Sequence, residues 1–82
     1  SDYGVHYQVN CLVSQLGLTE LSYIIKESLL EPAPQYAKSK IAATWGCLNL
    51  GLLECRADIE NLLMTSTWEP LRWTCAEVLR KL

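Results

Sequence analysis

The sequence predicts an all-α protein of about five helices that pair as antiparallel hairpins. Along the 82 residues, apolar side chains recur at steps of three and four, which is the spacing of a helix with one buried face. No segment shows the strict polar–apolar alternation of a half-buried strand. Short breaks that contain glycine or proline separate the periodic segments, and such short connections favour antiparallel neighbours.

The first predicted helix covers residues 3–16, and Gly17 suits the left-handed cap that often ends a helix. Its inward side chains are expected to be Val5, Val9, Leu12, Val13 and Leu16. Thr19 is a suitable N-cap for the second helix. The inward side chains of this second helix are expected to be Leu21, Ile24, Ile25, Ser28 and Leu29. It stops at Glu31-Pro32-Ala33-Pro34, because proline cannot continue a helix interior.

The third predicted helix begins near Pro34, which fits a first helical turn, and ends near Gly51. Its apolar stripe is Ala37, Ile41, Trp45 and Leu48. The fourth helix covers residues 55–65, with Ile59, Leu62 and Leu63 pointing inward. The fifth begins near Glu69-Pro70 and reaches the last residue, with inward side chains Leu71, Cys75, Val78, Leu79 and Leu82.

Composition limits the possible functions. We expect residues 1–82 to form one helical-repeat domain, because 82 residues allow no more than one. Half of the residues are hydrophobic, a high share for so small a globule, so we expect the chain either to pack against something else or to be a fragment of a longer solenoid. The net charge of −2 gives no basic footprint, which makes nucleic acid an unlikely partner. The longest uncharged stretches are too short or too polar to span a membrane, and the N-terminus lacks the pattern of a signal peptide.

The four cysteines are interpreted as free thiols of an intracellular protein, cytoplasmic or nuclear. Cys11, Cys47, Cys55 and Cys75 each lie beside apolar residues at helical spacing, where a thiol acts as a small hydrophobe. Their separations of 36, 8 and 20 residues match no zinc motif. The alternative is two disulfides, for which three pairings are possible.

Two features of the sequence suggest a repeat. Leu16-Gly17-Leu18 recurs 34 residues later as Leu50-Gly51-Leu52. The stretch EPLRWTCAEVLRKL resembles the first helix of a HEAT-like, armadillo-type repeat of the variety found in phycobilisome lyases. The matching positions are Glu69-Pro70 at the opening, Leu71-Arg72 as the aliphatic-Arg pair, Cys75-Ala76 as the small pair and Leu79 at the close.

The resemblance is clearest over residues 54–82, where IENLLMTSTW is similar to the second helix of such a repeat. AATWGCLNLGL matches more loosely, with Gly46-Cys47 as the small pair and Ala43 in place of the arginine, and Leu12 stands where a small residue is usual. The resemblance implies a short right-handed α-α superhelix. Small residues at mid-helix would let backbones approach closely, and Arg72 would bond carbonyls or carboxylates of the adjacent repeat.

No residue is assigned a catalytic, cofactor-binding or metal-binding role. His6 and Cys11 lie five apart on one helix, which is not adjacent in angle, so they do not form a predicted dyad. The carboxylates of Glu54, Asp58 and Glu60 complement the dipole at a helix start. The predicted function is therefore a non-catalytic protein–protein interaction module or scaffold.

Six residues are candidate contacts for a partner: Tyr23, Lys26, Asn61, Met64, Trp68 and Trp73. The first four lie on the outer faces of the second and fourth helices, which line the concave side of a solenoid. Exposed tryptophan is enriched at binding hot spots. The alternatives are a solvated exterior for the first four and, for the tryptophans, a place over the next helix pair. Lys38, Lys40 and Arg72 form either a small basic spot or a solvated face.

The expected partner is another protein or a second copy, bound through uncapped ends. The first helix has no charged residue after Asp2, and Leu79 and Leu82 have no further helix to cover them. The alternative is a polar outer face made by Gln8, Asn10, Ser14 and Gln15, with the fifth helix folded back as a cap. Two other functions stay open: a phycobilisome-lyase-like accessory protein and a nucleic-acid-associated helical scaffold.

Overall fold

The computed structural model describes residues 2–82, which form five α-helices and no strand. The helices are α1 (Asp2–Gln15), α2 (Ser22–Leu30), α3 (Ala37–Leu50), α4 (Arg56–Thr65) and α5 (Glu69–Lys81). Short 3₁₀ turns precede three of them: η1 (Thr19–Leu21), η2 (Pro34–Tyr36) and η3 (Leu53–Cys55). The prediction of an all-α chain with five helices is confirmed.

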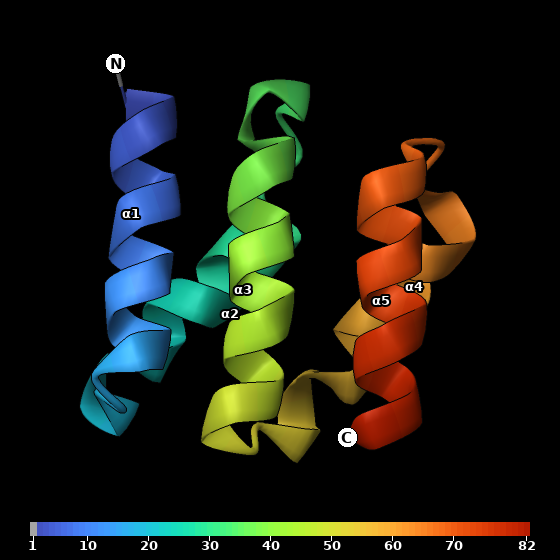
Figure 1. Cartoon of the computed structure of the whole chain (residues 1–82). Helices are drawn as coiled ribbons and strands as arrows, with labels where there is room; N and C mark the ends of the chain where they lie inside the picture. Colours follow the sequence, from blue (N-terminus) through green and yellow to red (C-terminus); the bar gives the residue numbers. More distant parts are fainter. Residues whose placement is uncertain (1) are drawn as a thin grey trace.

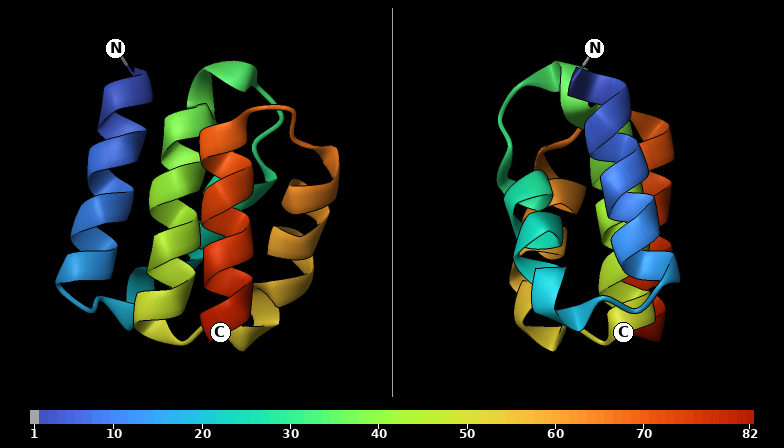
Figure 2. Two further views of the ribbon diagram at one scale, coloured as in Figure 1. Left: turned by 45° about the vertical axis from the view of Figure 1, so that its right-hand side comes forward. Right: turned by 90° about the vertical axis from the view of Figure 1, so that its left-hand side faces the viewer.

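The helices form two layers. In Figure 1, α1, α3 and α5 lie side by side with their N-terminal ends at the same end of the molecule, and α2 and α4 lie behind them. We call these the front layer and the back layer; the side view in Figure 2 separates them clearly. Successive helices alternate between the two layers, and short connections join them. The centre is α3, which packs against α1, α2 and α5.

The two connections from the front layer to the back layer have the same geometry. Gly17 and Gly51 adopt φ angles of 63° and 66°. Leu18 N donates to Val13 O at 3.0 Å, and Leu52 N donates to Cys47 O at 2.9 Å. Each glycine N–H also donates to the carbonyl three residues earlier, so both helices end in a Schellman motif. The predicted caps at Gly17 and Gly51 are confirmed.

Thr19 is not the N-cap that the sequence predicts. It begins η1, and the residue before α2 is Leu21, which makes no side-chain capping hydrogen bond. The extra 3₁₀ turn explains the difference, because Thr19 N donates to Gly17 O and Leu21 N to Leu18 O. These bonds use the backbone groups of the turn before the α-helix begins.

The apolar core confirms the expected inward faces of α2, α4 and α5 in large part. Its fully buried members include Ile25, Ile59 and Val78, each at 0% exposure. Leu79 and Leu82 are partly buried against this core, so the expectation that they lack cover is wrong. All five helices contribute residues to this core.

The predicted inward face of α1 is largely wrong. Val5, Leu12 and Leu16 are 57%, 51% and 65% exposed, whereas Val13 and Asn10 are buried. The pattern does not define the inward side of this helix, because apolar residues lie on every side of it and positions 3–15 carry no charged residue. Packing on α2 and α3 decides the orientation, and it turns Asn10 inward to donate to Ser28 Oγ at 2.8 Å.

The predicted stripe of α3 is only half-buried. Its four residues are partly accessible, and the fully buried side of the helix carries small residues instead: Ser39, Ala42, Ala43, Thr44, Gly46 and Cys47. A helix with neighbours on three sides needs small side chains toward the closest of them. Gly46 is such a contact, because an added Cβ would lie 2.8 Å from Ile25 Cδ1.

The small pair of α5, Cys75-Ala76, is divided between the core and the surface. Cys75 is fully buried, but Ala76 is exposed, so the expectation of a two-residue contact is wrong for Ala76. Arg72 donates to the carbonyls of Leu63 and Ser66, which end the preceding helix α4. The expected bonds from Arg72 to backbone carbonyls are confirmed, and they join α5 to α4, the helix that precedes it.

Candidate partner-binding surfaces

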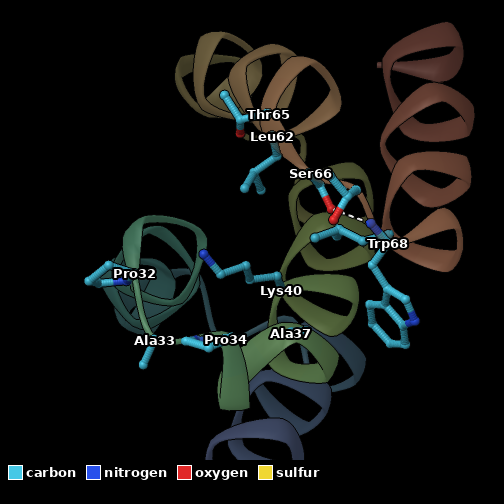
Figure 3. Close-up of a pocket in the computed structure, with 11 residues that line it drawn as sticks. Pro32, Ala33, Pro34, Ala37, Lys40, Leu62, Thr65, Ser66 and Trp68 are labelled. Carbon is cyan, nitrogen blue, oxygen red and sulfur yellow. Dashed lines mark hydrogen bonds between the residues drawn. The ribbon is translucent and has the colours of Figure 1, made fainter.

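Two hollows lie at the end of the front layer where α3 and α5 begin. The first, which we call the Lys40 cleft, has a volume of about 560 Å³ and lies between the α2–α3 and α4–α5 connections. Its walls combine apolar side chains such as Pro34 and Leu62 with the hydroxyl groups of Thr65 and Ser66. Figure 3 shows Lys40 extending across the cleft toward Pro32.

Lys40 is the charged group of this cleft. Burial lowers the pKa of its ammonium group, and the nearby Glu31 carboxylate acts in the opposite direction. Within residues 2–82 the ammonium group forms no ion pair and no hydrogen bond. The Lys40 ammonium group is therefore partly desolvated, and its N–H donors are available for a ligand.

The second hollow, which we call the Tyr–Trp groove, also has a volume of about 560 Å³ and runs over the outer surface of the front layer. Tyr3 and Tyr7 of α1 line one end, and Trp68 lines the other. These three rings are 44%, 41% and 39% exposed. Tyr3 is held in place by an edge-on contact with Tyr36, at 5.1 Å between ring centroids.

A pair of tryptophans adds aromatic surface to the same layer. The rings of Trp45 and Trp73 lie 6.3 Å apart in a tilted arrangement between α3 and α5. Trp73 is 61% exposed, whereas Trp45 is half-buried. Trp45 therefore belongs to the edge of the core, and Trp73 lies over it with most of its surface in solvent.

The structure does not bring the six sequence-predicted contact residues together on one surface. Tyr23 and Lys26 lie on α2, and Asn61 and Met64 lie on α4; all four are exposed on the back layer. Trp68 precedes α5 and Trp73 lies within it, both in the front layer. Tyr23 lines a separate hollow of about 250 Å³ between α1 and α2.

Sequence reasoning missed Tyr3, Tyr7 and Ile41 as lining residues, and it considered Lys38 and Lys40 only as part of a basic spot. A signal for the tyrosines was present, since residues four apart share one face of a helix. The position of Lys40 over a cleft depends on where the α4–α5 connection lies, which the pattern of α3 does not contain.

Charge is divided unequally between the layers. Residues 19–31 and 53–65, which hold the back helices, carry six acidic residues and two basic ones. Residues 37–50 and 69–81, which hold α3 and α5, carry two acidic residues and five basic ones. The chain as a whole is acidic, yet its aromatic front layer carries the basic excess.

Nothing in the described part of the chain assembles a metal site or a nucleophile. No group of three or more His, Cys, Asp or Glu residues in residues 2–82 could hold a metal ion. The His6 ring lies on Tyr36, at 4.6 Å between centroids, and the Cys11 thiol lies beside Tyr7, whose pKa it raises. His6 and Cys11 thus contact different aromatic partners.

All four cysteines are free in the structure. Cys47, Cys55 and Cys75 are buried, and Cys11 is half-buried. Burial raises the pKa of each of the three buried thiols, and the proximity of Cys55 raises that of Cys47 further. These thiols are therefore poor nucleophiles near neutral pH, because the thiolate is the reactive form.

The sequence matches no protein-family model, and no curated protein shows significant similarity to it. Among residues 2–82, no helix combines the length and the apolar character that crossing a membrane requires. Fold alone does not define a function, so the surfaces described above carry the functional argument.

Proposed function

We propose that this chain is a non-catalytic protein–protein interaction module built from HEAT-like helical repeats. Three observations support the repeat: helices alternate between two layers, the Schellman caps at Gly17 and Gly51 lie 34 residues apart, and small residues fill the contacts of α3. In such an architecture each hairpin buries its apolar face against a neighbour, so the ends of the array offer surfaces for binding.

The observation that carries the proposed function is the exposed face of α1. Val5, Leu12 and Leu16, which we call the α1 stripe, share one side of the helix and are each more than half exposed. No charged residue occurs between positions 3 and 19. A contiguous apolar surface of this kind marks an interface more often than a solvated face.

The test compares wild type with Leu12→Asp/Leu16→Asp by light scattering and by binding of a hydrophobic dye. We expect wild type to self-associate or bind dye, and the variant to lose most of that signal while its helical circular dichroism is retained. Gln15→Asp/Thr19→Asp is the matched control, because it adds the same charge to exposed positions at and just beyond the C-terminal end of α1 that belong neither to the stripe nor to the lining of the two hollows. It should behave as wild type.

Affinity capture from a cell extract extends the same comparison. Proteins that bind through this surface should be retained by wild type and by the control, and lost from the Leu12→Asp/Leu16→Asp variant. A wild-type chain that stays monomeric, binds no dye and captures the same proteins as the variant would contradict the proposal. We further propose an intracellular location, since buried free thiols persist in reducing compartments.

A further inference from the structure

We propose that the Lys40 cleft and the Tyr–Trp groove form one docking path for an extended acidic segment of a partner protein, which crosses Trp68. This inference rests on the proposed function, and it adds the chemistry of the partner and the surface that binds it. The path is distinct from the α1 stripe, since neither hollow is lined by Val5, Leu12 or Leu16.

Charge complementarity is the main argument. Among the residues that line the Lys40 cleft, only Lys40 is charged, and among those of the Tyr–Trp groove, only Lys38 is charged. Both hollows therefore present a cation without an acidic residue, although the chain has a net charge of −2. A partner segment with carboxylates would meet no acidic side chain in the lining of either hollow, although Glu31 acts on Lys40 from outside the cleft lining.

The two lysines reach different hollows because of their spacing on α3. Residues two apart on a helix are separated by about 200° around its axis, so their side chains point to nearly opposite sides. Lys40 extends into the cleft, in the direction of Pro32 (Figure 3), and Lys38 lines the groove on the outer surface. An extended segment that bonds both lysines must pass between the beginnings of α3 and α5.

Trp68 occupies this crossing point, since it lines both hollows. Its backbone is fixed at the start of α5: Trp68 N donates to Ser66 Oγ at 3.2 Å, and Trp68 O accepts bonds from the N–H groups of Leu71 and Arg72 at 3.1 Å. The backbone position from which the ring extends is thus set before binding, which reduces the entropy lost on binding. An apolar residue of the partner would lie here, with carboxylates on either side of it.

Polar groups along the path suit an extended backbone. Gln35 and the tyrosines line the groove, and Thr65 and Ser66 line the cleft. Their side chains can bond the peptide N–H and C=O groups that an extended segment leaves unpaired. A nucleic acid fits less well, because every one of its residues carries a phosphate charge and each hollow is lined by a single lysine.

Peptides from a displayed random library are selected on the immobilised full chain. The affinity of the fluorescein-labelled selected peptides is then measured by fluorescence polarisation. We expect the selected peptides to be enriched in Asp and Glu around an apolar residue, and to bind more weakly as the salt concentration is raised. Lys38→Gln/Lys40→Gln should weaken binding on the order of tenfold. Arg80→Gln/Lys81→Gln, the matched control, makes the same charge change at the other end of α5 and should leave the affinity unchanged.

The outcomes separate this inference from the proposed function. The docking path would be overturned if the selected peptides showed no excess of acidic residues. It would also be overturned if they bound the Lys38→Gln/Lys40→Gln variant as tightly as wild type. Peptide binding that is lost in Leu12→Asp/Leu16→Asp but kept in the lysine variant would overturn it too, although this result would still support an interaction module. A fluorescein-labelled single-stranded oligonucleotide that binds wild type more tightly than any peptide would also overturn it, in favour of nucleic acid. Helical circular dichroism and an unchanged melting temperature establish that each variant is folded.

Discussion

Replacing Gly46 with alanine tests the close approach of α3 to α2. An added Cβ would lie 2.8 Å from Ile25 Cδ1, 3.4 Å from Ile25 Cγ1 and 3.5 Å from Ser14 Cβ. The first distance is shorter than a carbon–carbon contact allows, so a neighbour must move. Ile25 is fully buried, and the end of its side chain cannot turn into solvent to make room.

Two contributions of opposite sign determine how Gly46→Ala changes the free energy of unfolding. Alanine is favoured over glycine in a helix interior by about 1 kcal/mol. Overfilling a packed core costs about 1–3 kcal/mol. We therefore expect Gly46→Ala to lower the free energy of unfolding by about 0–2 kcal/mol. Gly4→Ala is the control: Gly4 also lies in a helix, but no atom lies within 4 Å of an added Cβ. It should be neutral or stabilise by up to about 1 kcal/mol.

A double-mutant cycle with Ile25→Val separates the two terms, because valine lacks the Cδ1 atom that causes the closest contact. In urea denaturation followed by circular dichroism, Gly46→Ala should raise the stability of the Ile25→Val protein by about 0.5–1 kcal/mol, close to the propensity term alone. If Gly46→Ala has the same effect in both backgrounds, the contact between Gly46 and Ile25 does not limit packing, and the reasoning is refuted.

Further predictions concern α5 and the thiols. Cys75→Leu should destabilise the protein by about 1–3 kcal/mol, whereas Ala76→Leu should change the melting temperature little, because only Cys75 is buried. Equal changes in melting temperature for the two variants would contradict this difference in burial. In the folded protein a thiol reagent should modify Cys11 first, and unfolding should expose four thiols; fewer than four would reveal a disulfide. Stability should fall as the pH rises above the ordinary thiol pKa of 9.0, because the unfolded chain then releases protons that Cys47, with its raised pKa, retains. Urea midpoints should therefore decrease more for wild type than for Cys47→Ala between neutral and alkaline pH, and parallel decreases would argue against this linkage.

Much of the fold can be predicted from local signals in the sequence. The three-and-four periodicity locates the helices, and the glycine and proline breaks locate their ends. Gly51 illustrates why: a φ of 66° is accessible to glycine at little cost, so the residue type itself indicates the left-handed cap. The inward faces of α4 and α5 follow equally well, since the charged residues of these helices mark the outer side.

Prediction fails where the sequence lacks such contrast. α1 has no charge at positions 3–15, so Val5 and Leu12 are as plausible inside as Val13. In α3 the predicted stripe through Trp45 is half-buried, because the closest contacts select small residues such as Gly46 instead. In both helices the outcome depends on the neighbours, which a single helix pattern does not describe.

The candidate surfaces, like the fold, can be predicted from the sequence only in part. The exposure of Trp73 and Met64 follows from their positions off the apolar faces, and the structure places both in solvent. The two hollows could not be predicted, because each one is formed by residues of segments that lie far apart in the sequence. The Lys40 cleft, for example, joins Pro34 to Ser66 across 32 residues.

Polar contacts explain why α1 leaves its apolar stripe outside. Asn10 Nδ2 donates to Ser28 Oγ of α2 at 2.8 Å, and Asn49 Nδ2 of α3 donates to Ser14 Oγ of α1 at 2.6 Å. Turning α1 to bury Leu12 would break both bonds and remove Val13 from the core. The Asn10–Ser28 pair is buried, and a buried polar pair can select one arrangement at some cost in stability, whereas the Asn49–Ser14 pair is exposed. The two bonds therefore fix α1 in the orientation that presents the stripe to a partner, and they connect the packing of the core to the proposed interaction surface.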